Sequence, residues 1–308
     1  MSASAPSFPD PGLPDGKLAV ALARGAGEVL RRLRADVDAA GGAFVAGDLK
    51  DAGDAASQAW LAAALAHARP DDAVLSEEAK DVGSRGTADR VWIIDPLDGT
   101  REFAERLSPV ESVDSPVEPV ETQVSTTATR GEWRDDFAVH VALWERGVAR
   151  SDGLVTGAVG LPARDAVPST AAPAARPSDA DAVLAGRRPL RIAASRSRPP
   201  EFVRELAERG DVELVPMGSA GVKVVSVVDG TVDAYVHAGG QYEWDSAAPV
   251  AVALAAGLEC TRLDGTPLVY NRQDPWLPDL FVCHPALAAR LRAALTEVGV
   301  DIKEGAQS

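Results

Sequence analysis

The chain has 308 residues, of which 46% are apolar, and it carries a formal net charge of −15. That length suffices for one large domain or two ordinary ones with a substantial core. The acidic balance argues against a nucleic-acid-binding surface, because phosphate backbones attract clustered Lys and Arg. It does not exclude small phosphorylated substrates, since divalent cations can lie between an acidic protein and a phosphate.

Cys260 and Cys283 are the two cysteines of the sequence, too few for a disulfide framework or a zinc site. Both are expected to be reduced core residues. No apolar run approaches the length of a transmembrane helix, and the N-terminus lacks the charged and apolar regions of a secretory signal. We therefore expect a cytoplasmic protein that contacts neither membranes nor nucleic acid.

The predicted elements of the first half begin after a lead, residues 1–16, whose Pro, Ser and Asp content predicts disorder. Apolar spacing then predicts helices over 18–34 and 57–68, and apolar runs predict strands over 73–75, 91–94 and 137–144. We interpret this alternation as an α+β half over 17–165.

Residues 105–132 interrupt that half. The stretch is acidic, contains Pro109, Pro116 and Pro119, and has no aromatic residue until Trp133. Such a composition offers little to a core, so we expect a flexible insertion that contributes little to stability.

The second half follows a Pro- and Ala-rich stretch that we interpret as a linker over 166–189. Strands are predicted over 190–194, 212–215 and 232–236, and helices over 200–209, 219–228 and 246–256. Strands that alternate with helices favour an α/β half over 190–308.

The most informative segment runs from Arg90 to Thr100. An apolar strand delivers Asp95 at its end, Pro96 turns the chain, and Asp98 follows three residues after Asp95. Two carboxylates on one turn can converge on hard cations, which prefer oxygen ligands. Taken alone, this spacing more often gives turn and capping residues.

Two further acidic segments weaken the interpretation of Asp95 and Asp98 as ordinary turn and capping residues. Glu77 and Glu78 follow the strand predicted over 73–75, and Asp245 stands at the start of an Ala-rich helix. Each has an ordinary interpretation, as surface glutamates or as an N-cap. Three acidic element ends together point to a metal cluster, although periodicity does not show that they meet. The histidines are isolated, and His140 and His237 are interpreted as structural.

In combination, these motifs resemble the inositol monophosphatase superfamily of magnesium-dependent, lithium-sensitive phosphatases. WIIDPLDGT at 92–100 is similar to the first family signature, and WDSAA at 244–248 to the second. Ser76 to Glu78 and Gly218 to Ala220 fit two further family segments. The resemblance covers about 17–160 and 190–285. It implies a mixed α/β fold, a layered α/β/α/β/α sandwich, and a possible homodimer.

The resemblance implies a set of metal ligands. Glu77, Asp95 and the Leu97 carbonyl would hold one Mg²⁺, and Asp95, Asp98 and Asp245 a second. Glu77 would also touch a weaker third ion, which makes it a catalytic residue as well.

The resemblance also implies how the attacking water is activated. Asp54 matches the family aspartate that pairs with the signature threonine, here Thr100, and the pair would orient and deprotonate the water. Asp48 and Asp51 lie close to Asp54 in the sequence and are not separated from it by spacing alone.

Within the superfamily, the sequence is most similar to the CysQ-type 3′(2′),5′-bisphosphate nucleotidases. Arg101-Glu102-Phe103 and the segment from Ser195 resemble theirs, whereas the glutamate that contacts inositol in other members falls on Ala238. The resemblance implies hydrolysis of the 3′-phosphate of adenosine 3′,5′-bisphosphate, a by-product of sulfate assimilation. The expected substrate contacts are Gly99, Thr100, Arg101, Ser195, Ser219 and Glu243.

Two alternatives stay open. One is a broader phosphatase for inositol 1-phosphate or fructose 1,6-bisphosphate. The other is a metal or phosphate sensor on the same scaffold, which usually lacks a ligand or the water-activating pair. Here the acidic residues and the Asp54–Thr100 pair are all in the sequence.

Overall fold

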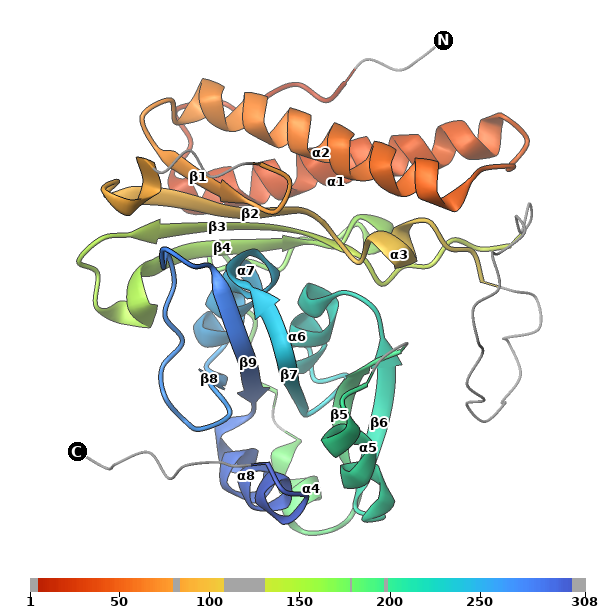
Figure 1. Ribbon diagram of the computed structural model, residues 1–308, viewed down its shortest axis with the longest axis vertical. Coiled ribbons are helices and arrows are strands. Elements are labelled where there is room, and N and C mark those ends of the chain that lie inside the picture. The colour runs from red at the N-terminus through yellow and green to blue at the C-terminus, as the bar shows by residue number, and fades with distance from the viewer. Residues whose placement is uncertain (1–4, 80–83, 108–130, 178, 197–198, 301–308) are drawn as a thin grey trace.

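The computed structural model describes residues 5–79, 84–107, 131–177, 179–196 and 199–300. These residues stack in five layers (Figure 1). Helices α1 (Asp15–Ala39) and α2 (Ala46–Ala68) cover a four-stranded sheet, and α6 (Ala220–Val228) and α7 (Glu243–Ala255) separate it from a five-stranded sheet. Helices α4 (Ala180–Leu184), α5 (Glu201–Glu208) and α8 (Ala288–Glu297) cover the far face. The expected layered α/β/α/β/α sandwich is confirmed.

The first sheet has the order β1-β2-β3-β4. Its strands are β1 (Ala73–Ser76), β2 (Arg90–Asp98), β3 (Ala138–Glu145) and β4 (Leu154–Gly160). β1 runs parallel to β2 and pairs Ser76 with Ile94, whereas β3 and β4 are antiparallel to their neighbours. Because parallel strands end at the same edge, the residue after β1, Glu77, leaves the sheet beside Asp95.

The second sheet has the order β6-β5-β7-β9-β8. Its strands are β5 (Leu190–Ser195), β6 (Val212–Met217), β7 (Ala234–Tyr242), β8 (Glu259–Thr261) and β9 (Trp276–Cys283). β5, β6 and β7 are parallel, and β9 is antiparallel to β7 and β8. Sequence analysis finds β5, β6 and the first residues of β7, but it does not predict β4, β8, β9, α4 or α8.

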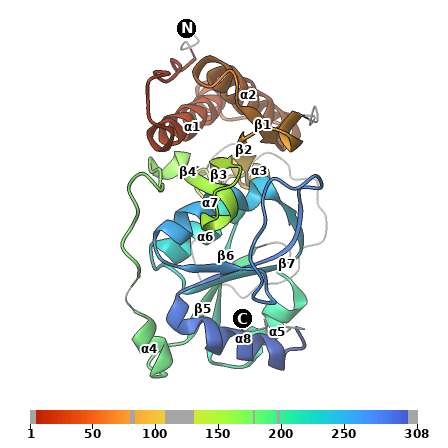
Figure 2. The ribbon, with the colours of Figure 1, turned by 90° about the vertical axis from the view of Figure 1, so that its left-hand side faces the viewer.

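A shared core joins the two halves of the chain. Buried residues of β2, such as Val91 and Ile93, belong to the same apolar cluster as Val222 and Val225 of α6 and Ala247 of α7. Figure 2 shows α6 and α7 lying between the sheets. Burial of this continuous cluster fixes the second half against the first, so a site at their junction has a defined geometry.

The N-terminal lead corrects one expectation, because the residues from Ala5 onward pack on the helices rather than being disordered. Trp60 donates its ring N–H to the Pro6 carbonyl at 3.0 Å, and Phe8 meets the Trp60 ring edge-on at 6.0 Å. Arg69 donates to the carbonyls of Pro11 and Leu13. Residues 1–4 lie outside the described residues.

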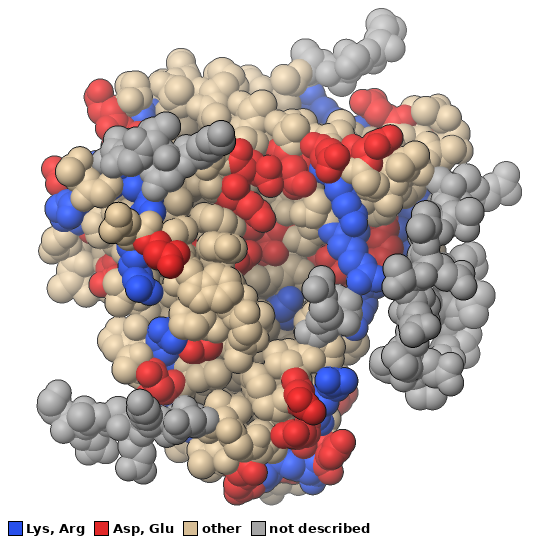
Figure 3. Space-filling view, viewed as in Figure 1, with Lys and Arg blue, Asp and Glu red and all other residues tan. Residues whose placement is uncertain are grey.

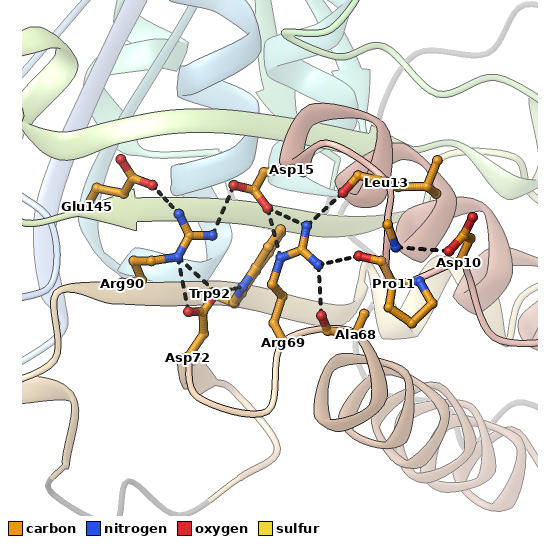
Figure 4. Close-up of polar contacts among 11 residues, drawn as sticks. Asp10, Pro11, Leu13, Asp15, Ala68, Arg69, Asp72, Arg90, Trp92 and Glu145 are labelled. Atoms are coloured by element: carbon orange, nitrogen blue, oxygen red, sulfur yellow. Dashed lines mark hydrogen bonds and ion pairs between the residues drawn. The ribbon is translucent and has the colours of Figure 1, made fainter.

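Asp15, the first residue of α1, ties the lead to the sheet (Figure 4). One of its oxygens accepts from Arg69 at 2.7 Å and the other from Arg90 of β2 at 2.9 Å. Two arginines share one partly buried carboxylate, which stabilises the contact between α1, α2 and β2.

The two interruptions predicted from composition differ in outcome. The stretch 166–189 contains α4, so it is only partly a connection. Most of the predicted insertion, residues 108–130, lies outside the described residues. Its flanks pair with each other: the Leu107 amide donates to the Glu132 carbonyl at 2.8 Å, and the Arg106 guanidinium lies 3.8 Å from the Trp133 ring centroid.

Buried Arg34 of α1 positions the short helix α3 (Thr100–Phe103). Its guanidinium donates to the carbonyls of Glu102 at 3.0 Å, Phe103 at 2.9 Å and Arg134 at 2.7 Å. Carbonyls at a helix C-terminus lack intrahelical partners, so these hydrogen bonds anchor α3 and the residues that precede it. Among the described residues, no helix combines the length and apolarity needed to cross a bilayer.

Close packing of α1 on α2 gives a test of the fold. A Cβ placed on Gly25 lies 2.0 Å from the Trp60 ring, whereas one placed on exposed Gly47 meets nothing within 4 Å. We expect Gly25→Ala to lower the free energy of unfolding by about 1–3 kcal/mol through overpacking. Gly47→Ala, the matched control, should raise it by up to about 1 kcal/mol through helix propensity. Urea unfolding of both variants checks this, and equal effects would contradict the packing.

Candidate functional site

Acidic residues from two elements converge where the two halves of the chain meet. Asp95 and Asp98 end β2, and Asp245 lies in the first turn of α7. One carboxylate oxygen from each lies within 4.8 Å of the others. Figure 3 shows Asp and Glu side chains gathered on this face with Lys and Arg beside them. The three aspartates that the resemblance assigns to one cation therefore do meet, which periodicity alone could not show.

The end of β2 is shaped to present these carboxylates. The ladder pairs Asp95 with His140 and Asp98 with Ala138, with an irregularity between them that contains Pro96. The Leu97 amide donates to Asp95 Oδ1 at 3.0 Å, which fixes that side chain. Gly99 follows with φ +87°, a left-handed conformation that favours glycine, and α3 begins at the next residue.

Asp245 caps helix α7 and also belongs to the acidic cluster. Its Oδ2 accepts from the Tyr242 amide at 2.6 Å, which caps the N-terminus of α7. Asp245 is therefore the N3 residue of a capping box whose N-cap is Tyr242, and not the N-cap that its place in the sequence suggested.

Burial and mutual repulsion raise the pKa of most carboxyls in the cluster. The pKa of Asp95 is well above its usual value because of burial and the charges of Asp98, Glu77 and Asp245. Burial and the charges of Asp245 and Asp98 raise the pKa of Glu77 to about 7. For Asp245, burial and Asp98 raise the pKa to about 6. Without a cation, these groups bind protons more tightly than ordinary carboxyls do.

Asp95 has an oxygen that lacks a partner. Its Oδ2 is buried and accepts no hydrogen bond from any of the residues that the structure describes. An unsatisfied buried carboxylate oxygen is costly, and a hard cation with oxygen ligands relieves both this cost and the repulsion. The donor set thus fits a divalent metal such as Mg²⁺.

Asp98 differs from the other carboxyls. Burial would raise its pKa, but His140, Lys223 and Ser219 lower it to about 2. His140 Nε2 lies 3.2 Å from Asp98 Oδ2, and the Ser219 hydroxyl donates to the same oxygen at 2.5 Å. Asp98 therefore stays ionised and supplies the negative charge that a cation needs.

Buried His140 is a neighbour of the cluster that sequence analysis treats as structural. Its Nδ1 lies 3.0 Å from the Trp244 carbonyl and 3.8 Å from Asp95 Oδ2. His140 could be assigned to the site only from its pairing with Asp95 in the β2–β3 ladder, and the sequence does not predict the register of that ladder.

The expected water-activating pair is brought together. Burial and the charges of Glu78 and Asp51 raise the pKa of Asp54 to about 6, and a hydrogen bond with Thr100 opposes them. The Thr100 hydroxyl also lies 3.1 Å from the Leu97 carbonyl, so its single proton can be donated to one or the other of these two acceptors. A carboxylate with this pKa is mostly ionised at neutral pH and can accept a proton.

A cleft of about 670 Å³ opens beside the cluster and is lined by both halves of the chain. Its wall includes Asp98 and Asp245 and three cationic residues, Arg101, Arg196 and Lys223. Arg196 pairs with Glu102 and Glu105. Lys223 is only 7% exposed, and it makes no hydrogen bond or ion pair with the part of the chain that the structure describes. Sequence analysis missed it, because it interrupts an otherwise apolar helix.

Most of the expected substrate contacts line this cleft: Gly99, Thr100, Arg101, Ser195 and Ser219. The Ser219 hydroxyl is already committed, since it donates to Asp98 and accepts from the Val222 amide. Glu243 is a correction. It is fully buried, and its carboxylate accepts from the amides of Asn271 and Arg272 at 2.7 and 2.8 Å. That carboxylate holds a loop and does not face the cleft.

Comparisons with known proteins agree with this geometry. The sequence profile described as the inositol monophosphatase family matches residues 15–299. A protein of Mycobacterium leprae named 3′-phosphoadenosine 5′-phosphate phosphatase is 44% identical over 296 residues, 93% of this chain and 95% of its own. A protein of Escherichia coli named 3′(2′),5′-bisphosphate nucleotidase CysQ is 28% identical, over 73% of this chain and 81% of its own.

Among solved structures, CysQ from Bacteroides thetaiotaomicron has a similar fold. The TM-score is 0.62 at 24% identity, with 88% of this chain and 97% of that chain covered.

The raised pKa values predict how the metal-free protein responds to pH. Carboxyls with a raised folded-state pKa bind protons more tightly in the folded than in the unfolded state, so their stabilising effect is complete at low pH. Stability from Asp95, Glu77 and Asp245 should therefore fall as pH rises from about 4 to about 7. Melting temperatures in chelator across this range check the sign. A rise in stability from this cluster would contradict the assignment.

A substitution isolates the contribution of Asp95. In chelator at neutral pH, Asp95→Asn should melt at or above the wild-type temperature, because it replaces a carboxyl whose ionisation is opposed by burial and by the charges of its neighbours. At a Mg²⁺ concentration about 100-fold above Kd, the wild type should gain about 2.7 kcal/mol and the variant far less.

Asp233 is the matched control, because Arg188 and the Arg191 amide lower its pKa despite its burial. Asp233→Asn should be destabilised in chelator and keep the full gain with Mg²⁺. An Asp95→Asn protein with an unchanged Mg²⁺ response would show that the cation binds elsewhere.

Proposed function

The chain belongs to the inositol monophosphatase family, and on that premise we propose that it removes the 3′-phosphate of adenosine 3′,5′-bisphosphate in a Mg²⁺-dependent reaction. The observation that carries the proposal is the buried acidic cluster at the cleft, with its unpaired Asp95 oxygen. The substrate assignment is supported by relatives that carry the name of this activity and match most of the chain.

The proposed ligands are those that the family resemblance implies, and three of them, Asp95, Asp98 and Asp245, form the cluster. Glu77, Asp95 and the Leu97 carbonyl would hold one Mg²⁺. Asp95, Asp98 and Asp245 would hold a second, and Glu77 would contribute to a third. When bound, the ions neutralise the charge of the phosphate dianion, lower the pKa of the attacking water and stabilise the leaving oxygen. Support comes from the carboxylate oxygens within 4.8 Å and from the repulsion that a cation would relieve.

Asp54 and Thr100 act on the attacking water. In the structure the Thr100 hydroxyl can donate to the Leu97 carbonyl, which the proposal assigns to a cation. Once that carbonyl is engaged, the hydroxyl proton is free to turn to Asp54, and the threonine oxygen can then accept from water. Asp54, with a pKa of about 6, takes up the proton at little cost near neutral pH.

Positive charge in the cleft suits a substrate with two phosphates. Exposed Arg101 follows Thr100 directly. Lys223 is a buried cation whose Nζ lies 5.4 Å from the centroid of the Tyr235 ring, with no hydrogen bond or ion pair among the described residues. An unpaired buried ammonium is costly, and a phosphate oxygen would satisfy it. We assign these two residues to the phosphates of the substrate.

Ala238 favours a nucleotide over a polyol phosphate. It lines the cleft and offers no hydrogen bond to a sugar hydroxyl. A broader phosphatase is the second candidate, whereas a sensor lacks support because neither a carboxylate of the cluster nor the Asp54–Thr100 pair is missing. The cytoplasmic location and the homodimer expected from the sequence remain predictions.

Loss of one carboxylate charge tests the metal assignment in catalysis. Asp95→Asn should lower kcat by at least about 100-fold, because an amide cannot neutralise two cations. Phosphate release from adenosine 3′,5′-bisphosphate with saturating Mg²⁺ measures this. Retention of most activity would refute the ligand set.

Relative specificity tests the substrate. The kcat/KM for adenosine 3′,5′-bisphosphate should exceed that for inositol 1-phosphate, since specificity is the ratio of these constants. Both substrates are assayed in parallel with the same enzyme preparation. A ratio that favours inositol 1-phosphate would establish the second candidate instead.

A further inference from the structure

The cleft carries two aromatic rings that neither the metal cluster nor the phosphates explain. Tyr242, which ends β7, is 41% exposed, and Trp276, which begins β9, is 39% exposed. Both line the same cleft as Asp98 and Asp245. Single exposed aromatic residues are ordinary, but a contacting pair on the wall of a cleft marks a binding surface.

The two rings form a corner. Their centroids are 5.4 Å apart and their planes meet at 77°, while Trp244 stacks behind Tyr242 at 4.6 Å with its plane tilted by 11°. A flat ring lying on one face of this corner meets the edge of the other ring. Both stacked and edge-to-face contacts of this kind are favourable.

The backbone around the corner leaves room and fixes its position. β7 is irregular between Ala238 and Gln241, and a Cβ on Gly240 would lie 1.7 Å from the Trp276 ring, so that ring covers bare backbone. The amide of Tyr242 donates to Asp245. This hydrogen bond holds one ring at a set place relative to the metal cluster.

Glu243 holds the second ring. Its buried carboxylate accepts from the amides of Asn271 and Arg272, and its own amide donates to the Pro275 carbonyl at 2.9 Å. These hydrogen bonds fix the loop that delivers Trp276. Glu243, which the sequence suggested as a substrate contact, is thus a positioning residue for this ring.

A polar group in the same wall also lacks a partner. Gln241 is 7% exposed and lines the cleft, and its Nε2 makes no hydrogen bond within the described ranges. A side-chain amide donor that is buried and unpaired favours a ligand with a hydrogen-bond acceptor, such as a ring nitrogen of a heterocycle. The small, uncharged residues Ala238 and Gly239 in the lining of the cleft suit a flat ring better than a polyol.

We propose that Tyr242 and Trp276 form a stacking platform for the purine base of the nucleotide substrate and that this platform selects nucleotides over inositol and sugar phosphates. This inference rests on the proposed function, because the platform would bind the base of the proposed substrate, adenosine 3′,5′-bisphosphate. Stacking on an aromatic ring uses the π-face that every base has. Purines other than adenine should therefore also bind.

Binding of AMP, the expected product, tests the platform without requiring catalysis. Calorimetry in Mg²⁺ should show that Trp276→Leu and Tyr242→Leu each weaken AMP binding by about 10-fold, as expected for the loss of one base–aromatic contact. Trp276→Phe and Tyr242→Phe, which keep an aromatic face, should retain most of the affinity. Ribose 5-phosphate, which lacks the base, should bind the wild type and all four variants equally.

The matched control is Phe8→Leu, because Phe8 is 45% exposed and packs on Trp60 outside the cleft. It should leave AMP binding unchanged. Equal AMP affinity in the wild type and the Leu variants would overturn the platform, as would a parallel loss of ribose 5-phosphate binding, which indicates a merely structural role.

Turnover separates failure of the platform from failure of the proposed function. With adenosine 3′,5′-bisphosphate, the Leu variants should lose about 10-fold in kcat/KM, mostly through KM, and with inositol 1-phosphate they should lose nothing. A wild type that prefers inositol 1-phosphate would refute the proposed function. The AMP titration would still decide whether the platform exists.

Discussion

Repulsion among clustered carboxylates is the constraint on which the site depends. Asp95 and Asp98 of β2 meet Asp245 of α7 at the junction of the two halves of the chain, and the charges of Asp245 and Asp98 also raise the pKa of exposed Glu77. The first sheet shares an apolar cluster with α6 and α7. Burial of this cluster offsets the free-energy cost of bringing the carboxylates together. A cation converts this repulsion into attraction, so the same arrangement that strains the metal-free protein prepares it to bind metal.

The cleft beside the cluster combines three kinds of side chain. Its lining includes carboxylates, the positive charges of Arg101 and Lys223, and the aromatic rings of Tyr242 and Trp276. These kinds of group suit a nucleotide bisphosphate, which carries both phosphates and a base. The hydrogen bond from the Tyr242 amide to Asp245 links the aromatic surface to the cluster, since one short segment carries an aromatic ring and a carboxylate of the cluster.

The sequence predicts the local part of this site well. A strand, a proline and a glycine signal the positions of Asp95 and Asp98 within ten residues. Asp245 is identified through its similarity to the second family signature, because a helix start alone favours an N-cap. His140 could not be assigned, because it reaches Asp95 only through the register of two strands separated by the insertion. Lys223 was hidden in an apolar helix. Trp276 lies on β9, whose strand signal is weak because Pro278 and Asp279 interrupt its apolar residues. Glu243 was misassigned because sequence does not show which way a side chain at a helix start will turn.

The claim that the junction of β2 and α7 holds divalent metal is tested most directly by locating the ion. Mn²⁺ is a close substitute for Mg²⁺ at oxygen ligands and scatters anomalously, so crystals grown with Mn²⁺ reveal its position. The account predicts anomalous peaks between the carboxylates of Asp95, Asp98 and Asp245, and beside Glu77. Peaks confined to other surfaces of the protein, with the three aspartates unliganded, would contradict it.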